Sequence, residues 1–167
     1  HPIVLSPVLC IVWGMSYEVT SEADGTLEIR VRVKPREGAG MLELEQQLQD
    51  GLNEAGAAAS GELLSRFDTD GSPLLVGASK RTSKGRHNKL YQSPYGPVEV
   101  SRHVYQGSGG GATYCPLERA ARIIGTATPK FAKMLSSKYA EGNSYAVCRD
   151  LLGNHGRKVS RCFVQDT

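Results

Sequence analysis

A dense run of cations is the feature of this sequence most able to do chemistry. Within the stretch SKRTSKGRHNK, ten residues carry five cationic side chains, namely Lys80, Arg81, Lys84, Arg86 and Lys89. No aspartate or glutamate occurs from Ser72 to Val98. Such a density of like charge repels itself unless an anion lies nearby, and the phosphates of a nucleic acid are the obvious candidates. The alternative is a solvated, mobile β-turn that keeps the protein soluble.

The closing segment holds a second candidate binding set, namely Arg157, Lys158, Ser160 and Arg161. The spacing predicts a helix from Arg157 to Asp166 that turns these residues outward and Val159, Cys162 and Phe163 inward. With the preceding helix and a turn over 153–156, it forms a helix-turn-helix arrangement, whose second helix enters the major groove. Arginine suits guanine or phosphate, and serine suits the backbone. An ordinary packed helical hairpin is the alternative.

The residue patterns of metal sites, nucleophilic catalysis and phosphate-binding loops are incomplete or missing in this sequence. Asp68 and Asp70 form a D-x-D-G that misses the remaining ligands of a calcium loop. The histidines show no metal spacing, and no serine lies in a nucleophile turn. The glycine run 107–111 lacks the Lys-Ser/Thr ending of a phosphate-binding loop, so we expect only a flexible loop there. We therefore predict no active site, no metal site and no small-molecule substrate.

The composition is that of an ordinary globular protein. The 167 residues are 40% hydrophobic and 22% charged, which excludes collagen, a disordered tail and a membrane bundle. Four cysteines are too few for a disulfide scaffold, which favours a reducing cytoplasmic setting, and they form no C-x-x-C pair of a zinc ribbon or redox motif. Residues 1–60 hold four basic and nine acidic side chains, 61–110 seven and four, and 111–167 nine and four. A polyanion should therefore bind the back half.

The first third predicts a ββα unit. Strands over 17–21 and 26–34 flank an Ala-Asp-Gly turn, and period-two alternation gives the second strand one apolar face. A helix follows whose stripe can cover that face: Met41, Leu44, Leu48, Leu52 and Ala55. The alanine-rich stretch to Gly61 reads as a break before a shorter helix over 62–67. We expect a scaffold or a protein-interaction piece.

The remaining elements are predicted from turn and cap signals. Short strands are expected over 72–78, 89–92 and 98–105, which leaves the cationic run in a hairpin loop. Thr128-Pro129 should begin a helix with a capping hydroxyl. Its buried stripe is expected to be Phe131, Met134, Leu135 and Tyr139. The next helix, capped by Asn143 or Ser144, should turn inward Val147, Cys148, Leu151 and Leu152.

Domain limits follow from these elements. We expect residues 1–14 to lie outside the fold with Met15 as the natural start, or alternatively an edge strand at Val8–Trp13. A ββα unit then covers 15–67, a basic β-hairpin unit covers 68–112, and a helical unit that looks truncated covers 113–167. The fold class is α+β.

Five segments, read in order, resemble the N-terminal region of ISKra-type insertion-sequence transposases over roughly residues 16–167. They are FDTDGSPLLVG, YQSPYGPVEVSRHVYQ, GGATYCPLERAARI, TPKFAKMLSSKYAE and VCRDLLGNHGRKVS. The resemblance implies that this chain is the part of the transposase that recognises DNA ends. It implies an RNase-H-like catalytic domain beyond Thr167, with three carboxylates (DDE) holding two divalent metals such as Mg²⁺. Relatives place C-x-x-C pairs in the β region, whereas this chain has only Cys115 there, so the β unit should be zinc-ribbon-like without zinc ligands.

The two cationic sets predict a nucleic-acid partner, and the resemblance implies that this partner is double-stranded DNA at the ends of a mobile element and that the role is transposition. Lys80, Arg81, Lys84, Arg86 and Lys89 would grip phosphate, and Arg157, Lys158, Ser160 and Arg161 would probe a groove. No cofactor and no membrane contact are expected, a homo-oligomer is possible, and the location would be cytoplasmic, on the nucleoid. The alternatives are a non-enzymatic interaction or oligomerisation module and an inactive transposase remnant.

Overall fold

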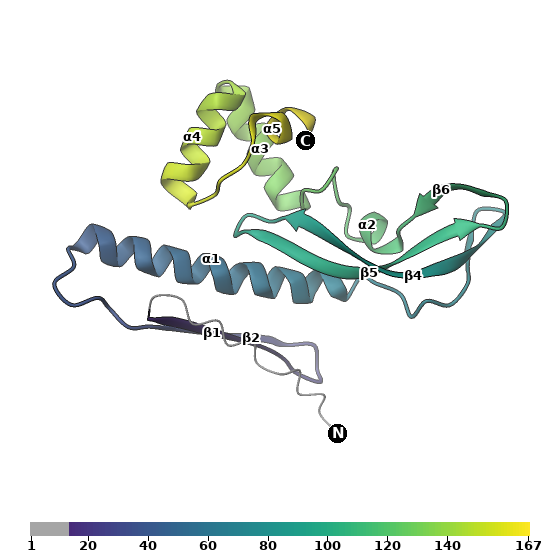
Figure 1. The fold of residues 1–167 in the computed structure, drawn as a ribbon, viewed down its shortest axis with the longest axis horizontal. Coiled ribbons are helices and arrows are strands. Elements are labelled where there is room, and N and C mark those ends of the chain that lie inside the picture. Colours follow the sequence, from purple (N-terminus) through teal and green to yellow (C-terminus); the bar gives the residue numbers. More distant parts are fainter. Residues whose placement is uncertain (1–13) are drawn as a thin grey trace.

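An antiparallel hairpin packed on a long helix begins the described part of the chain. The structure is a computed structural model that describes residues 14–167. The expectations for residues 1–13, a segment outside the fold or a strand at Val8–Trp13, lie outside the described residues. Strands β1 (Met15–Ser21) and β2 (Leu27–Val33) pair as predicted and pack on helix α1 (Met41–Ser65) (Figure 1). The α+β class and the hairpin-on-helix unit are confirmed.

α1 is one continuous helix, so the predicted break in the alanine-rich stretch is wrong. Alanine is the best helix former, and the glycines lie where other elements approach. A Cβ added at Gly51 would lie 2.8 Å from Met15 Sδ, and one at Gly56 would lie 2.5 Å from Cγ of Tyr95. The glycines therefore admit neighbours rather than end the helix.

Small residues make the closest contact with the hairpin. Gly51 and Ala55 are buried, while Met41, Leu48 and Leu52 are 68%, 47% and 49% exposed. The prediction that the large side chains of this stripe cover the hairpin is thus wrong for these three. Because the hairpin approaches α1 closely at Gly51, these three large side chains lie beside the α1–hairpin contact rather than in it.

The middle of the chain forms a four-stranded antiparallel sheet in the order β3-β4-β5-β6. β3 (Leu74–Val76) is short, β4 (Ser79–Gln92) and β5 (Pro97–Gly107) form a long ribbon, and β6 (Gly110–Tyr114) closes its outer end. The cationic run therefore lies along a strand, which corrects the predicted hairpin loop. Most of this run pairs with β5, and a register shift between Ser83 and Arg86 interrupts the ladder. The predicted loop over 107–111 is instead the end of β5, a tight turn at Ser108 and Gly109, and the start of β6.

Four helices complete the chain: α2 (Pro116–Ala120), α3 (Pro129–Glu141), α4 (Ser144–His155) and α5 (Arg161–Asp166). Thr128 is the N-cap of α3, as predicted, but its hydroxyl makes no capping hydrogen bond. Asn143 caps α4 by accepting from Ala146 N. The helix predicted from Arg157 begins four residues later, because Gly156 (φ 60°) ends α4 and Ser160 caps α5.

Two apolar cores hold the parts together. One lies inside the helical bundle of α3, α4 and α5: Ala127, Phe131, Ala132, Leu135, Val147, Leu151 and Val164. Tyr139 and Leu152, which were predicted to point inward, are instead 44% and 56% exposed, and Cys162 is exposed too. The other core joins α1, the ribbon and α2: Leu64, Tyr91, Val98, Val100 and Leu117.

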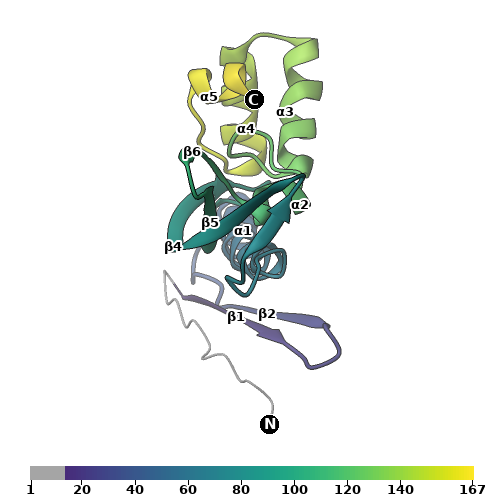
Figure 2. The ribbon, with the colours of Figure 1, turned by 90° about the vertical axis from the view of Figure 1, so that its right-hand side faces the viewer.

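The elements stack in tiers. The hairpin lies on one side of α1, and the sheet, α2 and the bundle lie on the other (Figures 1 and 2). The outer end of the ribbon extends past the C-terminal end of α1 (Figure 1). This arrangement separates the acidic first third from the basic remainder.

Candidate nucleic-acid interface

The five ribbon cations differ in what holds them. Within residues 14–167, Lys80 and Lys84 make no ion pair and are exposed. Arg86 donates to the Ser101 carbonyl at 2.9 Å and lies 3.9 Å from an Asp68 oxygen. Lys80 and Lys84 are therefore the ribbon cations with the most freedom to meet an external anion.

Lys89 instead belongs to an internal network around Glu118. Its Nζ lies 2.8 Å from Glu118 Oε1, which also accepts from Tyr91 OH at 2.8 Å and from Arg102 Nε at 3.3 Å. Burial alone would raise the pKa of Glu118, but these hydrogen bonds and the nearby cations hold it below the usual value. Burial, and then the bond to Glu118, raise the pKa of Tyr91. Lys89 is thus a structural cation rather than a free phosphate contact.

A second internal pair lies on the other side of the ribbon. Asp68 accepts from the His103 backbone N–H at 3.0 Å, and its Oδ2 lies 3.0 Å from His103 Nδ1. The Asp68 side chain is only 7% exposed. Asp68 therefore fastens the chain after α1 to β5, and among the described residues no group of three or more His, Cys, Asp or Glu is arranged to hold a metal ion.

Arg157 is buried, which corrects its predicted outward position. It is 4% exposed, donates to the Ser93 carbonyl at 3.0 Å and to Gln92 Oε1 at 2.9 Å, and lies 5.2 Å over the Phe131 ring. Burial lowers the pKa of this guanidinium. The prediction of an outward Arg157 is wrong because the helix begins at Arg161, and residues 157–160 form a non-helical link between α4 and α5.

The other three closing residues lie near the surface. Lys158 is exposed, and Arg161 is exposed with its Nε 3.3 Å from Ser144 Oγ. The Ser160 hydroxyl accepts from Phe163 N, so it caps α5. These residues lie on the bundle, and the ribbon cluster lies on the long strand to its side, so the structure does not bring the two predicted sets into one cluster (Figure 1).

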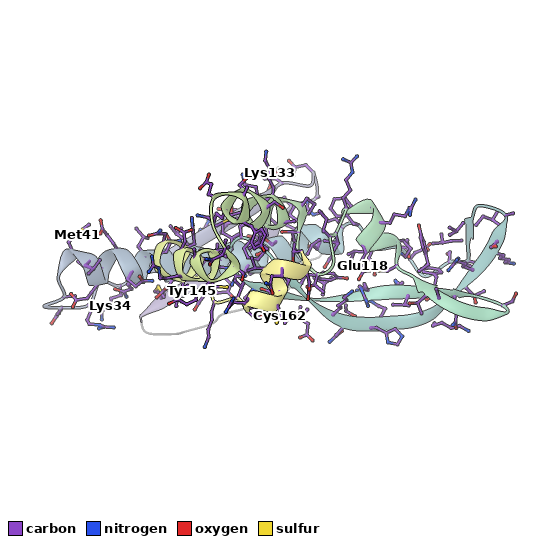
Figure 3. All side chains as sticks on the ribbon, turned by 90° about the horizontal axis from the view of Figure 1, so that it is seen from above. Lys34, Met41, Glu118, Lys133, Tyr145 and Cys162 are labelled. Carbon is purple, nitrogen blue, oxygen red and sulfur yellow. The ribbon has the colours of Figure 1, made fainter. Side chains whose placement is uncertain are left out.

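Sequence reasoning missed a third set of cations, which follows the ribbon in the chain. Arg119 and Arg122 lie at the end of α2, Lys130 and Lys133 lie in the first turns of α3, and all four are exposed. We call these four the α2–α3 basic surface. A signal was present in the sequence, because no acidic residue occurs between Glu118 and Glu141. Seen from above, Lys133 lies on the bundle and Glu118 between the bundle and the ribbon (Figure 3).

Arg122 has an unusual backbone. Its φ of 54° makes it the non-glycine residue with positive φ in the described part of the chain. Ile123 N bonds to Glu118 O and Arg122 N to Arg119 O, which is the pattern that ends a helix with a left-handed residue. Glycine is favoured there, so an arginine costs conformational energy. The cation is kept at a position that the backbone disfavours.

A large groove between α1 and β5 is a poor place for a nucleic acid. Three arginines in its lining, Arg36, Arg86 and the buried Arg157, are outnumbered by five carboxylates: Glu43, Asp50, Glu54, Glu62 and Glu99. An anion entering it would meet like charge. No helix within residues 14–167 has the length and apolar character needed to cross a bilayer.

Comparison with known proteins identifies no family. No family model matches the chain, and no curated protein matches it. The transposase resemblance therefore stays a prediction, and the functional argument depends on the site itself.

Proposed function

We propose that this chain binds double-stranded DNA through the exposed cations of the ribbon, the α2–α3 basic surface and the bundle. Its role would be the end-recognition part of a DNA transposase, working in the cytoplasm on the nucleoid. The observation that carries the proposal is the separation of charge between tiers. α1 holds five carboxylates and no lysine or arginine, whereas the exposed ends of α2 and α3 are basic. The α2–α3 basic surface attracts phosphate, and α1 repels it.

The bundle supports a revised helix-turn-helix. Only Gly142 and Asn143 separate α3 from α4, whereas five residues separate α4 from α5. The tighter turn makes α4 the second helix of the motif, the one that meets the major groove. Tyr145 and Arg149 are exposed one turn apart near its start. These two side chains replace Arg157 as groove contacts, with Lys158 and Arg161 as phosphate contacts beside them.

A salt titration of duplex binding tests the proposal. Affinity for a mixed-sequence duplex should fall steeply with NaCl, with a slope of about −0.9 in log–log terms for each phosphate neutralised. The double variant Lys130→Gln/Lys133→Gln should weaken binding and flatten the slope. The matched control is Arg32→Gln/Lys34→Gln, which removes two exposed cations from the acidic tier and should change little. Equal effects of the two doubles, or no salt-dependent binding, would reject the proposal.

Exposed apolar side chains on α1 favour a second candidate, a subunit contact between two copies of this chain. Leu48 and Leu52 lie one turn apart and are about half exposed (47% and 49%). Because α1 is acidic, its self-association should strengthen as salt screens the carboxylates. DNA binding should weaken under the same change. Sedimentation of the Leu48→Glu/Leu52→Glu variant, with Leu42→Glu as the control, decides: a chain that is monomeric without substitution rejects this candidate.

A further inference from the structure

The outer end of the ribbon lies away from the bundle (Figure 1). A hollow lies at this end. Its lining comes from the start of β4 and from the glycine turn between β5 and β6: Ser79, Lys80, Arg81, Gly107, Ser108, Gly109, Gly110 and Ala112. The sheet register explains why these segments meet. Arg81 pairs with Gly107, and Gly107 pairs with Gly110.

Arg81 is fixed in this hollow. Its Nη1 donates to the Ala112 carbonyl at 3.2 Å, and its guanidinium lies 5.5 Å from the centre of the Tyr114 ring. Its Nε is buried and has no hydrogen-bond partner within residues 14–167. No carboxylate lines the hollow, and Lys80 adds a second positive charge. Because Nε is buried, an oxyanion would meet the outer nitrogens of this fixed guanidinium rather than Nε, and arginine binds oxyanions through such charged hydrogen bonds.

The glycine turn leaves this site open. Gly110 and Gly111 have φ of 77° and 88°, which explains glycine at those two positions. Gly109 has no positive φ, and a Cβ added there meets nothing within 4 Å. Neither conformation nor packing therefore requires glycine at 109. The backbone of the turn is therefore uncovered at Gly109, and a ligand can approach it.

We infer that the hollow binds one phosphate group, held by Arg81 and Lys80 against the turn 107–110. This inference deepens the proposed function, since the phosphate would be a diester of the duplex backbone. The same chemistry also fits a free phosphate, and the experiment below separates the two sources. Ser79 and Ser108 also line the hollow, and serine hydroxyls are donors of the kind that phosphate oxygens accept.

The test combines affinity with amide chemical shifts, using the full chain. Addition of the mixed-sequence duplex should shift the amides of Ser108 to Gly111. Arg81→Gln should lower duplex affinity roughly tenfold, as expected for a lost charged hydrogen bond, and Arg32→Gln is the charge-matched control. Gly109→Glu should weaken binding by adding a repelling carboxylate. Gly109→Ala, with space for its Cβ, should keep the fold and most of the affinity.

The outcomes separate the hollow from the proposed function. If the unmodified chain binds duplex and Arg81→Gln and Gly109→Glu bind equally well, the hollow is wrong while DNA binding stands. If the unmodified chain does not bind duplex, the proposed function fails, and a titration with inorganic phosphate decides whether the hollow is a phosphate site. If the free anion shifts the amides of Ser108 to Gly111, and Arg81→Gln abolishes these shifts, the hollow is a site for free phosphate. If the free anion shifts none of these amides, the inference is overturned.

Discussion

Arg157 Nη2 and Nε both donate to the carbonyl of Ser93, 64 residues earlier in the chain, at 3.0 and 3.3 Å. Ser93 is itself fully buried, and its hydroxyl donates to the Gly96 carbonyl and accepts from Gly96 N in the β4–β5 turn. One guanidinium therefore links the bundle to the turn of the sheet.

Removal of that guanidinium should destabilise the protein without a direct effect on DNA. Arg157→Ala leaves a buried carbonyl unpaired and a space over Phe131, so we expect a loss of about 3 kcal/mol in the free energy of unfolding. Urea unfolding measures it. Arg161→Ala, at an exposed arginine, should change stability by less than about 0.5 kcal/mol. If Arg157→Ala were as stable as Arg161→Ala but bound DNA less tightly, the side chain would face the nucleic acid after all.

Substitution of a packed glycine of α1 by alanine should lower the stability of the protein, whereas the same substitution at a helical glycine without close neighbours should raise it. Gly56→Ala puts a Cβ 2.5 Å from the Tyr95 ring, so it should destabilise by about 1–3 kcal/mol despite the better helix propensity. Gly153, inside α4, has nothing within 4 Å of an added Cβ. Gly153→Ala should therefore stabilise by about 1 kcal/mol. Thermal unfolding of both variants checks the pair, and a stabilising Gly56→Ala would contradict the close contact.

These glycines also show what the sequence can and cannot give. Period-two alternation is enough to predict the hairpin, and the cap signal at Asn143-Ser144 is enough to predict the start of α4 to within one residue, because both signals are local. Whether Gly56 ends a helix or admits Tyr95 depends on a contact 39 residues away in the chain.

In the candidate site too, local features are predictable from the sequence and tertiary contacts are not. The charge run of the ribbon is visible as composition, so its existence is predictable. Which of its members are free is not, since Lys89 is held by Glu118 through tertiary packing. Arg157 was misplaced for a related reason: its apolar neighbours fit a helical period, but Gly156 ends the helix before it.

Glu118 should make stability depend on acid pH. Its pKa in the folded protein lies below the unfolded value, so its contribution is present above about pH 4.5 and is lost as pH falls below that. Glu118→Gln should cost about 2 kcal/mol at pH 7, because Lys89 and Arg102 lose their charged partner. The cost should shrink at pH 3. Unfolding at both pH values measures it, with Glu141→Gln as the exposed control. A cost that is the same at both pH values would contradict the charged state of Glu118.

A substitution at Arg122 tests whether its strained backbone is tolerated because its side chain binds DNA. Arg122→Gly relieves a left-handed backbone that glycine adopts freely, so stability should rise by about 1 kcal/mol. The same change removes a cation from the α2–α3 basic surface, so duplex affinity at low salt should fall several-fold, with a flatter salt slope. Arg119→Gln removes a neighbouring charge without changing a strained position, so it should lower affinity and leave stability nearly unchanged. Urea unfolding and duplex titration of the two variants give both quantities. A more stable Arg122→Gly variant that binds DNA as tightly as the unmodified chain would leave the strain at this position without a binding role.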